Sequence, residues 1–257
     1  MPRRLGCTLL ALFFLGFASA VPGGADMVAK PKLQAGIPAF TILEQIMRAS
    51  GQAGTAVSVA NTPLVTWLAP SDPRLQPDYI LAAPVGQLYA VRTMSGLLLP
   101  MAASVDFGVR YLHTPLLLIT INTDNMALAM LQAKGEKPTL EIAAELQQLA
   151  SLLQTPNSVP DQQLGQVEQL VDSQVRLAVA RYQDRIANHR LTVVGGVIDL
   201  ANFYQRGAGR LIIINVNGET DGARLGQMSL MRRLDKETRD YLGRRGMTVI
   251  QPQVQKR

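Results

Sequence analysis

The sequence is poor in the two residue types that most often bind transition metals. In 257 residues it has one cysteine, Cys7, and two histidines, His113 and His189. Cys7 lies in a segment that we expect to be cleaved off, which would leave a mature chain without thiols. Such a chain has no disulfide, no thiol nucleophile and no thiolate–metal site. A zinc site built on the two histidines would need carboxylates to complete it.

Aromatic residues are also scarce, at 5% of the chain, although 47% of the residues are hydrophobic. The apolar side chains are therefore mostly aliphatic, which favours a packed α/β core and argues against a disordered chain. The few aromatic residues do not interleave with the basic ones, as they do in many nucleic-acid-binding proteins. We therefore expect no nucleic-acid partner.

The first 20 residues have the pattern of a secretory signal peptide. MPRR supplies positive charge, the apolar run LGCTLLALFFLGF follows, and Ala18-Ser19-Ala20 is a small-x-small cleavage signal. The apolar run is short for a membrane span, although a retained membrane anchor is the alternative. We predict that residues 1–20 are removed, that the protein is exported to the periplasm or secreted, and that residues 21–38 form a flexible N-terminus.

Positive charge is concentrated near the C-terminus. Residues 206–257 contain eleven Lys or Arg against five Asp or Glu. We predict a separate basic C-terminal segment at 223–257. A solvated basic face is the simplest interpretation, and a weak contact with an anionic membrane or an acidic protein is the alternative.

Between these ends, short aliphatic runs alternate with segments of helical periodicity. This order predicts one α/β domain over residues 39–222, with a central, mainly parallel sheet flanked by helices. The expected strands are 64–69, 88–91, 115–121, 190–200 and 211–216, and the expected helices are 40–50, 101–112, 126–133, 140–153 and 162–188.

Polar side chains follow two of these strands. PSDPR, with Asp72 and Arg74, comes after the first strand, and Asn122-Thr123-Asp124-Asn125 comes after the third. Ligands of such sheets bind beyond the carboxyl ends of the strands, so these two loops are the candidate site.

Four motifs in this order resemble those of the β-class carbonic anhydrases. PSDPR (70–74) stands where that family has Cys-x-Asp-x-Arg, and VRTMSG (91–96) stands where it has Val-Arg-Asn-x-x-Gly. NTDN (122–125) stands at the family's His-x-x-Cys, and GGVIDL (195–200) at its Gly-x-x-Tyr-Asp-Leu. The resemblance covers about residues 40–216. It implies the β-carbonic-anhydrase fold, zinc bound by the two cysteines and the histidine, and a homodimer that exchanges N-terminal helices.

The departures from the family pattern fall on the zinc ligands. Pro70 and Asn125 replace the two cysteines, and Asn122 replaces the histidine. Asn oxygens are poor zinc ligands, and a proline side chain cannot bind a metal. Zinc lowers the pKa of its bound water from about 15.7 to about 7, so hydroxide would be scarce without it. We therefore expect no zinc cofactor and no CO2 hydration.

The retained Asp72 and Arg74 allow three interpretations. They could form a charge-assisted pair that only holds the loop. Arg74 could instead join Asn122 and Asn125 in a pocket for a small anion such as bicarbonate. The pair could also be catalytic, in CO2/bicarbonate interconversion or in another reaction of an altered enzyme. The leading hypothesis is a pseudoenzyme that acts as a binding or interaction protein.

Smaller roles are expected for the other polar residues near the strands. We expect Asp124 to cap the helix that follows it and Asp199 to tie down a turn. His113 and His189 each precede a strand and are expected at the surface.

Overall fold

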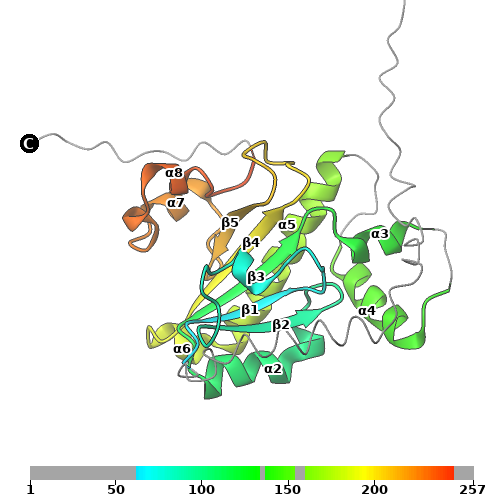
Figure 1. Cartoon of the computed structure of the whole chain (residues 1–257), viewed down its shortest axis with the longest axis horizontal. Helices are drawn as coiled ribbons and strands as arrows, with labels where there is room; N and C mark the ends of the chain where they lie inside the picture. The colour runs from blue at the N-terminus through cyan, green and yellow to red at the C-terminus, as the bar shows by residue number, and fades with distance from the viewer. Residues whose placement is uncertain (1–61, 134–136, 154–159, 246–257) are drawn as a thin grey trace, which may run out of the picture.

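The predicted α/β fold is confirmed by the computed structural model, which describes residues 62–133, 137–153 and 160–245 (Figure 1). Five strands form one sheet in the order β2-β1-β3-β4-β5. The first four are parallel, and β5 runs antiparallel to β4. Their bounds are β1 (Val65–Pro70), β2 (Leu88–Thr93), β3 (Leu116–Asn122), β4 (Thr192–Asp199) and β5 (Arg210–Val216). The predicted helix at 40–50, the predicted signal peptide and residues 21–38 lie outside the described residues.

The four predicted helices that fall within the described residues are present, but two of them are subdivided. The segment predicted at 101–112 consists of a 3-10 turn (Leu99–Met101), α2 (Ala102–Asp106) and a π-helical stretch (Phe107–Tyr111). Within that stretch Gly108 packs so closely on Thr66 and Tyr89 that a Cβ atom would not fit. The helix predicted at 162–188 is divided into α5 (Pro160–Arg181) and α6 (Gln183–Ala187). The remaining two are α3 (Met126–Gln132) and α4 (Leu140–Ser151).

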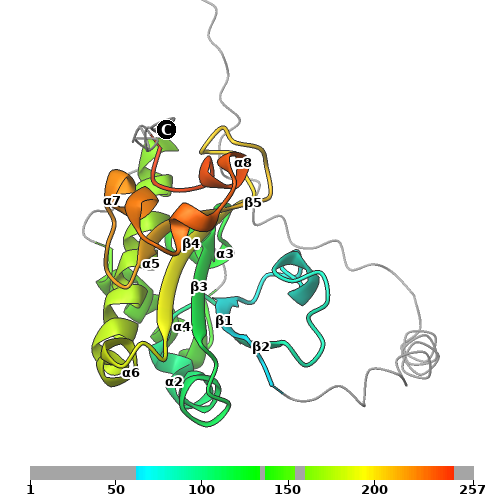
Figure 2. The same cartoon turned by 90° about the vertical axis from the view of Figure 1, so that its left-hand side faces the viewer.

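One face of the sheet packs against α5 and α2 (Figure 2). Its core is aliphatic, as the composition predicts, and includes Leu117, Ile119 and Val193. The long helix α5 lies close to β4 because Gly195 has no side chain. A Cβ atom at Gly195 would lie 2.5 Å from Val175 Cγ2 and 2.7 Å from Val171 Cγ1.

We expect Gly195→Ala to lower the free energy of unfolding by about 1–2 kcal/mol, because the added methyl group would overpack this contact. Gly165→Ala is the matched control, since a Cβ atom there meets nothing within 4 Å and Gly165 is exposed on α5. That substitution is expected to stabilise the protein slightly by its higher helix propensity. Urea unfolding of both variants gives the comparison, and equal effects would contradict the close packing of α5 on β4.

The other face is covered by the loop after β1 and by the C-terminal segment. Leu75 from the loop and Leu225, Met231 and Leu242 from the C-terminal segment join Trp67 in a second core. The C-terminal segment contains α7 (Gly222–Gln227), a 3-10 turn (Met231–Arg233) and α8 (Lys236–Arg239).

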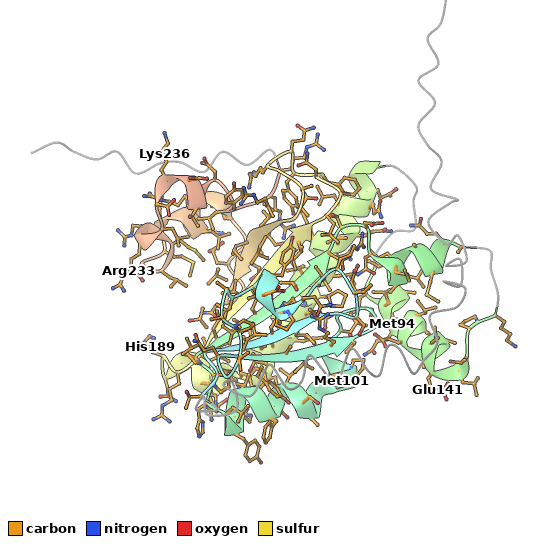
Figure 3. All side chains as sticks on the ribbon, in the orientation of Figure 1. Met94, Met101, Glu141, His189, Arg233 and Lys236 are labelled. Atoms are coloured by element: carbon orange, nitrogen blue, oxygen red, sulfur yellow. The ribbon has the colours of Figure 1, made fainter. Side chains whose placement is uncertain are left out.

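The described part of the predicted basic segment, up to residue 245, is thus packed on the sheet. Leu242 forms a parallel β-bridge with Ile213, and Arg244 forms ion pairs with Asp172 and Glu168 of α5. Arg233 and Lys236 point outward (Figure 3). No helix of the described residues combines the length and the apolar character that a bilayer span needs.

Candidate functional site

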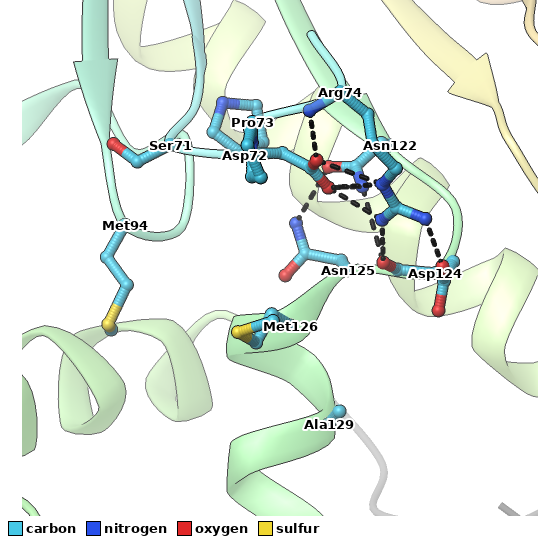
Figure 4. Close-up of a pocket in the computed structure, with 11 residues that line it drawn as sticks. Ser71, Asp72, Pro73, Arg74, Met94, Asn122, Asp124, Asn125, Met126 and Ala129 are labelled. Atoms are coloured by element: carbon cyan, nitrogen blue, oxygen red, sulfur yellow. Dashed lines mark hydrogen bonds and ion pairs between the residues drawn. The ribbon is translucent and has the colours of Figure 1, made fainter. Parts of the chain in front are cut away.

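The candidate site lies where the carboxyl ends of β1 and β3 meet. The two strands are parallel neighbours in the sheet, so the loops that follow them share one edge. Between these loops and α3 is a pocket of about 330 Å³ (Figure 4). Its lining combines apolar and polar side chains: Pro70, Ser71, Asp72, Pro73, Arg74, Met94, Asn122, Asp124, Asn125, Met126 and Ala129.

The predicted pairing of Asp72 with Arg74 is present. The backbone N–H of Arg74 donates to Asp72 Oδ1 (2.9 Å), and Nη2 donates to Oδ2 (2.7 Å). Nε lies 3.0 Å from Oδ1. The side chain of Asp72 is only 10% exposed, whereas that of Arg74 is 48% exposed. Hydrogen bonds from Arg74 hold the pKa of Asp72 below its ordinary value, so this carboxyl is ionised at neutral pH.

A second carboxylate lies on the other side of the same guanidinium. Arg74 Nη1 is 2.5 Å from Asp124 Oδ2, and Nη2 donates to the backbone carbonyl of Asp124 at 3.2 Å. These bonds tie the loop after β1 to the loop after β3. Both carboxylates raise the pKa of Arg74, which remains charged. Figure 4 shows the guanidinium between the two acids.

The expectation that Asp124 caps the following helix is wrong. The N-cap of α3 is Asn125, whose side-chain oxygen accepts from the backbone N–H of Leu128 at 3.1 Å. Asp124 stands one residue too early and has a left-handed backbone, with φ of 58°. This conformation lets its side chain meet Arg74 instead.

The two asparagines are buried and hydrogen-bonded to each other and to the acid. Asn122 Nδ2 donates to Asp72 Oδ2 at 3.1 Å, and Asn125 Nδ2 donates to Asn122 Oδ1 at 3.3 Å. The structure therefore brings together all four predicted site residues. It joins them into one network, in which Arg74 and Asn122 both donate to Asp72.

Arg92 of β2 also holds the loop after β1. Its guanidinium donates to the carbonyls of Asp72 and Leu75 and lies 5.0 Å from the centre of the Trp67 ring. The sequence placed Arg92 in a family motif but gave no indication of these contacts, because their acceptors are backbone groups of an irregular loop.

The loop after β3 has a second anchor in Asp199. The Asp199 carboxylate accepts from the backbone N–H groups of Phe203 and Tyr204 at 2.9 and 2.8 Å, which confirms that it ties down a turn. It also accepts from the hydroxyl of Thr123 at 3.1 Å.

Comparison with known proteins explains this arrangement of motifs. The sequence model of the family described as carbonic anhydrase matches residues 65–204, more than half of the chain. The chain belongs to the carbonic anhydrase family. No curated protein sequence matches the chain.

Solved β-carbonic anhydrases have the same fold at low sequence identity. The β-carbonic anhydrase of Sordaria macrospora superposes with a TM-score of 0.55 at 14% identity, covering 68% of this chain and 95% of that one. The Coccomyxa enzyme, solved with acetazolamide, gives 0.53 at 17% identity, covering 73% and 89%. A β-carbonic anhydrase of Aspergillus fumigatus gives 0.53 at 18% identity, covering 68% and 90%.

The residues of this carbonic anhydrase homologue do not fit a zinc ion at the pocket. The positions that the family motifs assign to the ligands hold Pro70, Asn122 and Asn125. Asn122 directs its N–H group, a donor, toward Asp72, and Asn125 uses its oxygen to cap α3. Asp72 and Asp124 are both paired with Arg74. In the described parts of the chain, no three His, Cys, Asp or Glu side chains are grouped as a metal site requires.

The two histidines cannot complete such a site. Both are exposed, as predicted, and both have left-handed backbones in the turns that lead into β3 and β4. They therefore lie at the amino ends of the strands, whereas the pocket is at the carboxyl ends. Figure 3 shows His189 at the opposite end of the sheet from Met94, which lines the pocket.

Proposed function

We propose that this protein is an exported β-carbonic-anhydrase-like protein that works without zinc and without CO2 hydration, as a binding protein on the family scaffold. The observation that carries the proposal is the state of the pocket. Arg74 pairs with both carboxylates, Asn122 donates to Asp72, and Asn125 donates to Asn122 and caps α3. None of the lining residues offers the thiolate or imidazole groups that zinc sites use.

The charge state of Asp72 argues against the alternative of an altered enzyme that uses Asp72 and Arg74. A general base works best when its pKa is near the working pH. The pKa of Asp72 is instead lowered, mainly by hydrogen bonds from Arg74, and the carboxylate also accepts from Asn122. Asp72 is therefore a weak base whose oxygens already have donors.

The predicted small-anion ligand also finds little support in the charges. A guanidinium has five N–H donors. Arg74 directs Nε and Nη2 at Asp72 and Nη1 at Asp124, and Nη2 also reaches the Asp124 carbonyl, which leaves one N–H of Nη1. Among the lining residues two carboxylates outnumber one guanidinium, which disfavours an anion such as bicarbonate.

A stopped-flow assay of CO2 hydration tests the proposal. We expect the full chain, supplied with added zinc, to give the rate of the buffer alone, while an active β-carbonic anhydrase in the same assay gives a fast rate. Hydration above background that rises in proportion to protein concentration would overturn the proposal. Export, dimerisation and the contact of residues 206–257 with a membrane or an acidic protein stay predictions. Fractionation and light scattering would test the first two.

A further inference from the structure

The hydrogen bonds of the pocket define which polar group a ligand needs. Asp72 accepts three N–H groups of Arg74 and one of Asn122, which fills the roughly four acceptor sites of a carboxylate. Asp124 is different, because only its Oδ2 is engaged by Arg74. Its Oδ1 is not an acceptor in any hydrogen bond between described residues, and the side chain is 26% exposed.

The charges and the apolar side chains that line the pocket further restrict the class of ligand that it can bind. Among the residues that line the pocket, two carboxylates face one guanidinium, so the lining carries a net negative charge. Arg92 donates to backbone carbonyls of the loop after β1 and does not line the pocket. The remaining wall is mostly apolar and comes from Pro70, Pro73, Met94, Met126 and Ala129, with Ser71 as its one hydroxyl side chain. A volume of about 330 Å³ is at the small end of the range for ligand pockets, about 300–1,000 Å³.

We propose that this pocket binds a small organic cation with a primary ammonium group, which donates to Asp124 Oδ1 while its hydrocarbon part lies on the apolar wall. The inference rests on the proposed function, because a zinc ion would place positive charge in the same space. An ammonium group supplies a charged donor for Asp124 Oδ1 and positive charge to balance the lining carboxylates, and a short alkyl chain displaces water from the methionine and proline side chains.

Titrations followed by amide signals in 15N–1H spectra test the inference. The probes are n-butylammonium chloride and sodium butyrate, which have similar chains and opposite charges, at equal ionic strength. We expect butylammonium to shift the signals of Asp72, Arg74 and residues 124–129 saturably, and butyrate to leave them unchanged. Equal or tighter binding of butyrate, or no saturable shift with butylammonium, would overturn the inference.

The variant Asp124→Asn removes the charge at nearly constant shape. We expect it to weaken butylammonium binding by about tenfold, as expected for one charge in a partly exposed site. Asp184→Asn is the control, because Asp184 pairs with Arg110 at the surface and does not line the pocket. Unchanged binding in Asp124→Asn would contradict the proposed contact. If this variant is unstable, the comparison of butylammonium with butyrate on the unaltered chain tests the inference.

These results are separate from those of the hydration assay. A chain without hydratase activity that also fails to bind butylammonium overturns only the ligand class. A chain with zinc-dependent hydration overturns the proposed function itself.

Discussion

Replacing Arg74 by methionine is expected to lower the free energy of unfolding by about 2 kcal/mol, the range for losing hydrogen bonds to a charged group that is mostly buried. The variant leaves Asp72 ionised at neutral pH with only the backbone N–H of residue 74 and Asn122 as donors. It also frees Asp124, so the loops after β1 and β3 lose their direct link. The expected loss of stability is smaller than for a fully buried ion pair, because the side chain of Arg74 is half exposed.

Thermal unfolding is the direct measurement, and a loss of this size corresponds to about 4–8 °C in Tm for a domain of 150–250 residues. Arg224→Met is the matched control. Arg224 is also paired with an acid, Glu219, but its side chain is 70% exposed, and we expect no measurable change. Equal Tm values for the unaltered chain and the Arg74→Met variant would show that the pair does not stabilise the fold.

The same pair predicts how stability depends on pH. The pKa of Asp72 in the folded chain lies below its ordinary value of 3.8. A carboxyl group with a lowered pKa stabilises the fold at pH values above its unfolded pKa, and this contribution is lost as the pH falls through the folded pKa. As the pH falls below about 4, the free energy of unfolding should therefore decrease more in the unaltered chain than in the Arg74→Met variant, which lacks the pair at every pH.

The second large effect is expected from restoring the family's zinc ligands. The triple variant Pro70→Cys, Asn122→His, Asn125→Cys places two thiols and an imidazole around the same pocket. We expect it to bind about one zinc per chain, because such ligands bind zinc with free energies of the order of 10 kcal/mol. Added zinc is then expected to raise its Tm, and a chelator to reverse the rise.

The double variant Pro70→Cys, Asn125→Cys is the control for the triple variant. It also loses the N-cap of α3, which costs about 1 kcal/mol, but lacks the imidazole that completes the ligand set. We expect it to hold zinc much more weakly. A folded triple variant that takes up no zinc would show that these three positions are not an emptied zinc site.

The sequence predicted the sheet well because its strands are short aliphatic runs. Four of the strands are parallel. Strands covered on both faces do not alternate apolar and polar residues, but polar loops mark their ends clearly. The pairing of Asp72 with Arg74 was expected from the resemblance of PSDPR to the family motif Cys-x-Asp-x-Arg. The convergence of PSDPR with Asn122 and Asn125 followed from the shared edge of parallel strands.

The features that escaped prediction depend on contacts distant in the sequence or on unusual backbone angles. Asp124 reaches Arg74 because its φ is 58°, a conformation that residue type alone does not specify. Arg92 acts on carbonyls of an irregular loop. The basic residues near the C-terminus concealed an apolar face, which packs Leu225 and Met231 on the sheet and joins Leu242 to Ile213 through a β-bridge.

The measurement that tests the central claim most directly is the zinc content of the full chain, purified from cells grown with added zinc. We expect elemental analysis to find far less than one zinc per chain, because the pocket offers Pro70, Asn122 and Asn125 and commits its carboxylates to Arg74. One tightly held zinc per chain would contradict this account. Loss of that zinc in the Asp72→Ala variant, which lacks the pair with Arg74, would place the ion in this pocket.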